Sequence, residues 1–147
     1  MEKKVVIRCT SSQRDETGQS EDVTLDTLGV YGEKEGCRYI TYDETSLSGM
    51  EGTTTTIRLY DGRVTLSRRG SFVQETEYIP GEVSRSEFMT PAGPMELITT
   101  SRDIIDTVKD GKGQLRLVYD IEIKGLFKHL NEIVIDIGEA HESSWKS

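Results

Sequence analysis

Five side chains of this chain could together bind an acid group. Strand alternation places Tyr42, Glu44, Thr55 and Arg68 on one face of a predicted sheet. An inward guanidinium beside a phenol can hold a carboxylate or phosphate through charge-assisted hydrogen bonds. Tyr119, in the apolar row of a later strand, would line the same interior. The sequence therefore predicts a ligand site made of these five residues.

The position of Arg68 depends on a hairpin at residues 61–62. Asp-Gly between two alternating segments is a strong signal for a two-residue loop of type I′. That loop pairs Thr55 with Arg68, which puts the arginine on the same face as the apolar Leu66. Burying a charge without a partner is costly, so Arg68 must meet an anionic or carbonyl group.

Two interpretations of Arg68 remain open. In the first, Arg68 and Tyr42 bind the acid group of a small amphipathic molecule in a cavity of at least about 300 Å³. The apolar part of that molecule would contact a set of interior side chains, namely Ile57, Leu66, Leu117 and Tyr119. In the second, Glu44 neutralises Arg68, and the pair closes one end of the fold without a ligand.

Other chemistry has little support in the residue pattern. His129 and His141 lack the spacing of a catalytic triad, and Ser71 has no histidine base nearby. Cys9 and Cys37 lack the spacing of a zinc site, and we expect them to be free thiols. No glycine-rich phosphate loop opens a helix. We therefore expect no catalytic residue, no metal and no cofactor.

The composition indicates an all-β protein. Threonine, isoleucine and valine number 16, 12 and 10, which is 38 of 147 residues, against two alanines. Such β-branched side chains favour strands. The length suits one domain, so we expect residues 1–147 to form one, with residues 139–147 as a flexible tail. The net charge of −8 disfavours nucleic acid and anionic membrane surfaces as partners.

The N-terminal segment predicts a cytoplasmic location. It holds three consecutive apolar residues, Val5 to Ile7, fewer than the roughly 7–15 residues of a secretory signal core. Elsewhere, no apolar segment approaches the roughly 18 residues with which a helix crosses a bilayer. We therefore expect a protein that neither enters the secretory pathway nor inserts into a membrane.

Alternating segments separated by turn residues predict about ten strands and little helix. The predicted strands cover residues 3–10, 21–33, 35–46, 53–60, 63–69, 71–79, 84–90, 94–108, 113–124 and 127–138. Two polar segments, residues 11–21 and 46–52, are predicted to be loops. The strand carboxylates that alternate with apolar residues, Asp106 and Asp120 among them, are assigned to the solvent-facing side.

Pairing of the first strand with the last would remove the exposed edges of such a sheet. Residues 113–124 alternate apolar and polar side chains, so one face is buried. The apolar row of Ile133, Ile135 and Ile137 could pair beside Val5 to Ile7. We predict a single up-and-down antiparallel β-barrel of about 8–10 strands, with a two-sheet sandwich as the alternative.

Several short motifs follow one another in a defined order. They are Tyr42-x-Glu44, the glycine-rich loop at 49–52, the Thr-Ile pair at 56–57, Arg68-x-Gly70 and the segment TPAGPMEL at 90–97. Their order and spacing resemble the YwiB-like family of small uncharacterised bacterial proteins. That family is similar to the calycins, so the resemblance implies a lipocalin-like barrel with no established activity. The lipocalin G-x-W signature is missing, because Trp145 is the only tryptophan.

Three functional hypotheses follow from these observations. The first is an intracellular lipocalin-like barrel that binds a small amphipathic or acidic molecule. The alternative is a protein-interaction module or homodimer with a filled core, which uses an outer face or an edge strand around residues 71–90, where apolar residues are dense. The third is an enzyme that acts through Glu44 with Arg68 or Tyr42 in the cavity, although the sequence shows no activated nucleophile.

Overall fold

The computed structural model describes residues 2–140, except for the side chain of Phe127. The predicted tail therefore lies outside the described residues, apart from Glu139 and Ala140. The described part contains ten β-strands and one 3₁₀ helix. Their bounds are β1 Glu2–Arg14, β2 Ser20–Lys34, β3 Cys37–Asp43, η1 Ser46–Ser48, β4 Thr53–Tyr60, β5 Arg63–Gly70, β6 Gln74–Tyr78, β7 Val83–Thr90, β8 Gly93–Asp106, β9 Gly113–Ile123 and β10 Phe127–Glu139.

The strands form one antiparallel, up-and-down and nearly closed barrel. The order is β6-β5-β4-β3-β2-β1-β10-β9-β8-β7. The first strand pairs with the last, with Ile7 opposite Ile137, which confirms the predicted pairing. The sheet edges are β6 and β7, which meet through an isolated bridge between Val73 and Met89. The predicted full closure is therefore incomplete at this seam.

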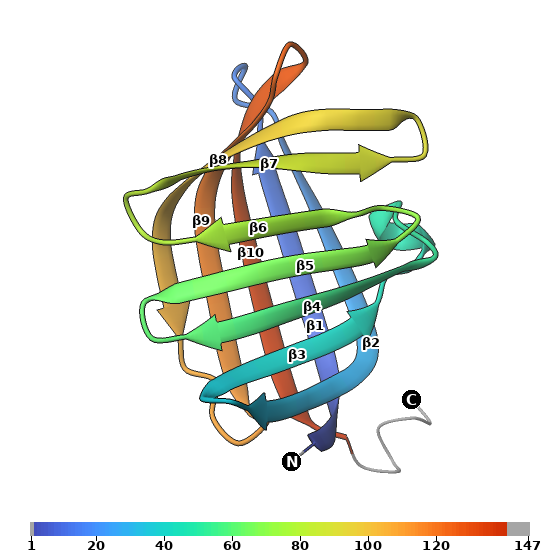
Figure 1. Cartoon of the computed structure of the whole chain (residues 1–147), viewed down its shortest axis with the longest axis vertical. Helices are drawn as coiled ribbons and strands as arrows, with labels where there is room; N and C mark the ends of the chain where they lie inside the picture. The colour runs from blue at the N-terminus through green and yellow to red at the C-terminus, as the bar shows by residue number, and fades with distance from the viewer. Residues whose placement is uncertain (1, 141–147) are drawn as a thin grey trace.

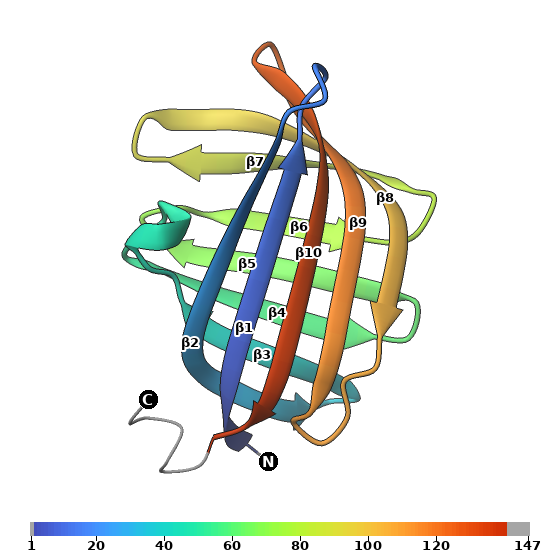
Figure 2. The ribbon, with the colours of Figure 1, turned by 180° about the vertical axis from the view of Figure 1, so that it is seen from behind.

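Two walls of strands enclose the interior. The long strands β1, β2, β8, β9 and β10 form one wall, which faces the viewer in Figure 2. The strands β3 to β7 cross in front of them in Figure 1 and form the other wall. Strand β2 belongs to both walls, because it pairs with β1 along its length and with β3 over its last six residues.

Gly29 allows β2 to join the two walls. It lies opposite Val5 on one neighbouring strand and Tyr42 on the other. A Cβ atom at this position would lie 2.4 Å from the Thr41 carbonyl oxygen and 2.5 Å from Cδ1 of Ile7. A side chain here would therefore force the strands apart, which explains a glycine inside a strand.

Inward side chains fill the middle of the barrel. The largest fully buried side chains are Val5, Ile7, Tyr31, Ile40, Ile57, Leu59, Val64, Leu66, Leu97, Leu115, Leu117 and Ile135. They follow the alternation predicted from the sequence, including the apolar row of residues 113–124. Burial of this apolar surface is the main contribution to the stability of the fold.

The hairpin at residues 61–62 has the predicted register and a different turn geometry. Thr55 lies opposite Arg68, as expected. Only Gly62 of the two loop residues has a positive φ, 71°, so the turn is not type I′. Type I′ signs occur at Glu35-Gly36 and Asp110-Gly111, where both residues of each pair have φ between 53° and 80°.

Residues 11–21 are mostly strand, so the predicted loop is wrong there. Strand β1 continues to Arg14 and β2 begins at Ser20. The turn between them is held by Asp15, whose side chain accepts hydrogen bonds from the backbone N–H groups of Thr17 and Gln19. These strand ends are rich in polar residues, which removed the apolar signal for a strand. No helix in the described part is long and apolar enough to cross a membrane.

Candidate ligand site in the barrel interior

A cavity of about 310 Å³ lies in the barrel interior, beside η1 and the β1–β2 hairpin. Its volume is close to the lower limit expected for a ligand site. Polar side chains from four strands line it: Arg68, Gln74, Tyr78, Tyr119 and Asn131. We call this region of the barrel the open end.

Arg68 lies at the wall of the cavity, with its side chain 15% exposed. Its Nη1 atom donates a hydrogen bond of 2.6 Å to Oε1 of Gln74, which lies opposite it on β6. Its Nε atom lies 3.9 Å from Oε2 of Glu44. That Nε atom is buried and has no hydrogen-bond acceptor among the described residues. The guanidinium therefore keeps at least one unused donor.

Tyr42, Glu44 and Thr55 form a buried layer behind Arg68. The Thr55 hydroxyl donates a hydrogen bond to Oε2 of Glu44, the same oxygen that approaches Arg68. Burial raises the pKa of Tyr42 well above its usual value, with Cys9 and Glu44 adding to the effect. The structure thus brings these three residues next to Arg68, as the alternation predicted. Arg68 and Tyr119 reach the cavity surface, whereas these three lie outside its lining.

Cys9 completes this layer. Its thiol lies beside Tyr42, and burial, followed by the charge of Glu44, raises its pKa to about 11. The thiol is therefore protonated at neutral pH. It behaves as a small apolar side chain beneath the site rather than as a nucleophile.

Tyr119 and Asn131 form the opposite wall of the cavity. The Tyr119 ring lies 5.0 Å from that of Tyr78, and burial raises the pKa of both phenols. Asn131 is 6% exposed, and its Nδ2 donates a 3.5 Å hydrogen bond to the Tyr119 hydroxyl. Its Oδ1 atom has no hydrogen-bond partner in the described part of the chain.

Gln74, Tyr78 and Asn131 are site residues that the sequence analysis missed. All three occupy inward positions of their strands, so the alternation of side chains could have identified them. Asn131 shares its parity with Ile133, and Gln74 shares its parity with Tyr78.

The apolar lining differs from the expected one. Ile57, Leu66 and Leu117 are packed in the core and do not line the cavity. The apolar side chains that line it are Val23, Leu47, Met50, Phe88, Leu97, Ile121, Ile123 and Ile133. The cavity is thus displaced from the centre of the barrel, where large side chains already fill the space.

Segment 71–90 directs part of its apolar surface inward. Tyr78 is buried, and Phe88 lines the cavity. Phe88 also stacks on Phe72, with ring centroids 5.7 Å apart. Met89 remains 36% exposed. Tyr78 and Phe88 of this segment therefore face the interior, whereas Met89 stays at the surface.

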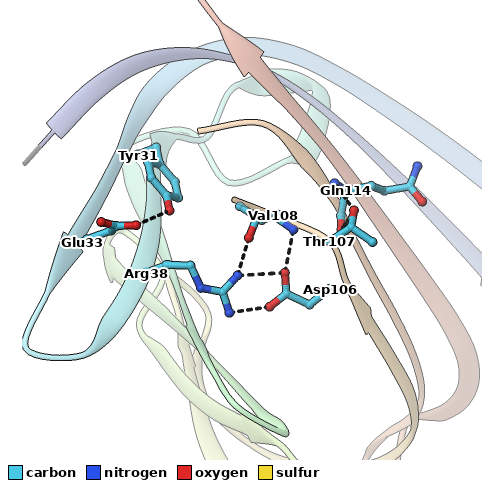
Figure 3. Close-up of polar contacts among 7 residues, drawn as sticks. All are labelled: Tyr31, Glu33, Arg38, Asp106, Thr107, Val108 and Gln114. Atoms are coloured by element: carbon cyan, nitrogen blue, oxygen red, sulfur yellow. Dashed lines mark hydrogen bonds and ion pairs between the residues drawn. The ribbon is translucent and has the colours of Figure 1, made fainter. Parts of the chain in front are cut away.

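A second inward arginine closes the barrel where β3 begins and β8 ends (Figure 3). Nη1 and Nη2 of Arg38 donate hydrogen bonds of 3.1 and 2.8 Å to the two carboxylate oxygens of Asp106. Nη1 also donates a 2.6 Å hydrogen bond to the Val108 carbonyl. The Val108 N–H donates in turn to Oδ1 of Asp106. We call this region the closed end.

The sequence analysis assigned Asp106 to the solvent-facing side, and the structure shows that this assignment is wrong. Its side chain is 15% exposed and points inward. The cause is a β-bulge between Ser101 and Asp103, which inserts Arg102 and shifts the register with β9 by one residue. After the bulge the inward positions become even-numbered. Asp106 therefore faces Leu115.

These features define a small up-and-down β-barrel with a closed end and, at the open end, a cavity lined by polar and apolar side chains. A family model described as "Domain of unknown function (DUF1934)" matches residues 7–135. The chain therefore belongs to this family.

Two comparisons connect the chain to the same relative, as the motifs indicated. The uncharacterized beta-barrel protein YwiB of Bacillus subtilis (strain 168) is 23% identical over 122 residues, covering 82% of this chain and 84% of the relative. The crystal structure of the ywiB protein from Bacillus subtilis superposes with a TM-score of 0.84 at 21% identity, covering 95% and 94% of the two chains. The resemblance to the YwiB-like family is thus confirmed, and the shared fold is a β-barrel.

Proposed function

We propose that this barrel binds a small acidic, amphipathic molecule, with its acid group on Arg68. The observation that carries the proposal is the buried Nε of Arg68, which has no acceptor among the described residues. Arg68 lines a cavity that is also lined by apolar side chains such as Leu97 and Ile133. A carboxylate or phosphate is the group that best satisfies an unused guanidinium donor.

Glu44 balances the charge of Arg68 without occupying its donors. The 3.9 Å separation from Nε is too long for a hydrogen bond. Oε2 of Glu44 already accepts a hydrogen bond from Thr55. Glu44 thereby lowers the cost of burying the arginine while leaving N–H groups available for a ligand. This arrangement favours binding over the interpretation in which the ion pair only closes the barrel.

The ligand must be small. A volume of about 310 Å³ lies near the lower limit of known ligand sites. Leu97 and Ile133 supply apolar surface next to the polar groups, so the molecule needs an apolar portion. An acid with a medium-length chain fits these conditions.

The test compares octanoate with octanamide, which replaces the charged group by a neutral one of similar shape. Isothermal titration calorimetry should show octanoate binding at least about tenfold more tightly, because a charge-assisted hydrogen bond is the stronger one. Arg68→Gln should remove that preference. Arg69→Gln is the matched control, because Arg69 is exposed and pairs with Glu75 on the outer surface.

Two outcomes would contradict the proposal. One is equal affinity of the wild-type protein for octanoate and octanamide, and the other is an unchanged preference in Arg68→Gln. A thermal melt of each variant confirms that the compared proteins are folded. Arg68→Lys serves as a second variant, because it keeps the charge and should retain part of the preference for the acid.

A further inference from the structure

A row of polar side chains crosses the long-stranded wall at the open end. Tyr119 lies opposite Asn131, Asn131 opposite Gln13, and Gln13 opposite Glu21. All four line the cavity, from four adjacent strands, β9, β10, β1 and β2. We call these four residues the polar row. Gln13 and Glu21 are exposed, whereas Tyr119 and Asn131 are buried and therefore need hydrogen-bonding partners.

Within the polar row, Asn131 has a buried polar atom without a hydrogen-bond partner in the described part of the chain. The side chain is 6% exposed, and its Oδ1 atom has no hydrogen-bond partner among the described residues. Its Nδ2 atom is already engaged with the Tyr119 hydroxyl. The free group of Asn131 is therefore an acceptor, and only a hydrogen-bond donor can satisfy it.

Arg68 and the polar row occupy different walls of the cavity. Arg68 and Gln74 lie on β5 and β6, which cross in front of β1 and β10 in Figure 1. Arg68, which has an unused donor, and Asn131, which has an unused acceptor, thus line different walls of the same cavity. A plain acid satisfies the first and leaves the second unpaired.

We propose that the ligand is an acid that also carries a hydroxyl or amino group, placed so that it donates to Oδ1 of Asn131. This inference rests on the proposed function, since it takes the acid group to be on Arg68. Apolar side chains such as Leu97 and Ile133 line the same cavity, so they favour a ligand whose acid and donor groups are joined by hydrocarbon. The carboxylate of Glu21, in the same row, adds a favourable partner for an amino group.

The experiment compares unbranched acids of six to ten carbons with their terminal hydroxy and amino analogues, on the wild-type protein. Calorimetry should show that, at the chain length that spans the cavity, the hydroxy or amino acid binds about threefold to tenfold more tightly than the plain acid. A neutral hydrogen bond contributes a factor of this size. The difference between the hydroxy and amino series reports the contribution of Glu21.

Asn131→Leu assigns the preference to its residue. The variant should bind the plain acid as wild type does and lose the preference for the hydroxy or amino acid. Gln114→Ala is the control, because the Gln114 side chain is exposed and donates to Asp136 away from the cavity. If Asn131→Leu does not fold, Asn131→Ala provides the same test.

The outcomes separate the two proposals. If plain acids bind and the terminal donor brings no gain at any length, this inference is overturned and the acid site on Arg68 stands. A gain that persists in Asn131→Leu also overturns it. If no acid of either series binds, both proposals fail.

Discussion

The closed end and the open end each place one arginine inside the barrel, yet they use it differently. At the closed end, Arg38 donates three hydrogen bonds, two to Asp106 and one to the Val108 carbonyl. At the open end, Arg68 donates one, to Gln74, and its carboxylate neighbour is 3.9 Å away. Arg38 is therefore part of a structural ion pair, whereas Arg68, which has an unused donor, is a candidate binding group.

The number of carboxylate oxygens available to each arginine explains the contrast. Asp106 presents both carboxylate oxygens to Arg38 in a two-pronged geometry, which is the strongest arrangement for this pair. Glu44 approaches Arg68 with a single oxygen, and Thr55 already donates to it. An incompletely satisfied polar group is a cost that proteins accept mainly at functional sites.

Removing the carboxylate of the closed end should have the largest effect. Asp106→Ala leaves Arg38 largely buried with one carbonyl acceptor, and it also removes the acceptor of the Val108 N–H. We expect a loss of about 3 kcal/mol in the free energy of unfolding, measured by urea denaturation, because the remaining charge is unpaired. A loss below about 1 kcal/mol would show that the closed end is not held by this ion pair.

Strand alternation explains how much of this comparison could be predicted. It placed Tyr42, Glu44, Thr55 and Arg68 together, because the hairpin register at residues 61–62 was correct. Arg38 and Tyr42 have the same parity on β3, so the same alternation could have predicted that Arg38 points inward.

The alternation of side chains could not predict two features of the structure. The β-bulge after Ser101 changes which residues of β8 face inward, and no glycine or proline marks it in the sequence. The position of the cavity also depends on how side chains such as Leu66 and Leu117 fill the centre, which is a property of three-dimensional packing. The strand ends before and after Asp15 were missed because their residues are polar.

Alkaline pH should weaken the open end through Cys9. Burial and the nearby Glu44 raise the pKa of its thiol from 9.0 to about 11, so the folded state holds a proton that the unfolded state has lost. The free energy of unfolding should therefore fall between pH 9 and about 11, by an amount on the order of 2 kcal/mol. Below pH 9 the contribution is fully present. Urea denaturation at a series of pH values measures the fall.

The decrease must be separated from that of the phenols. Burial also raises the pKa of Tyr42 and of Tyr119, so these groups destabilise the fold as they lose protons at high pH. Cys9→Ala should reduce the fall between pH 9 and about 11, whereas Cys37→Ala should leave it in place because Cys9 is still present. Equal falls in wild type and in Cys9→Ala would exclude the thiol as the cause.

The smallest change in the free energy of unfolding is expected when both charges of the open-end ion pair are removed together. Arg68→Gln combined with Glu44→Gln removes both charges together and keeps an acceptor for Thr55. The double variant should stay within about 1 kcal/mol of wild type, because a buried pair without a hydrogen bond gains little over its desolvation cost. The matched pair of changes, Arg38→Gln with Asp106→Asn, should cost about 2 kcal/mol, since charge-assisted hydrogen bonds are lost.

The ratio of these two losses decides which interpretation of Arg68 holds. If the open-end variant loses as much free energy of unfolding as the closed-end variant, Arg68 and Glu44 stabilise the barrel in the way Arg38 and Asp106 do. The arginine would then have no donor to spare for an acid. If the open-end variant is nearly as stable as wild type and has lost the preference for octanoate over octanamide, the unused Nε of Arg68 contributes to binding rather than to folding.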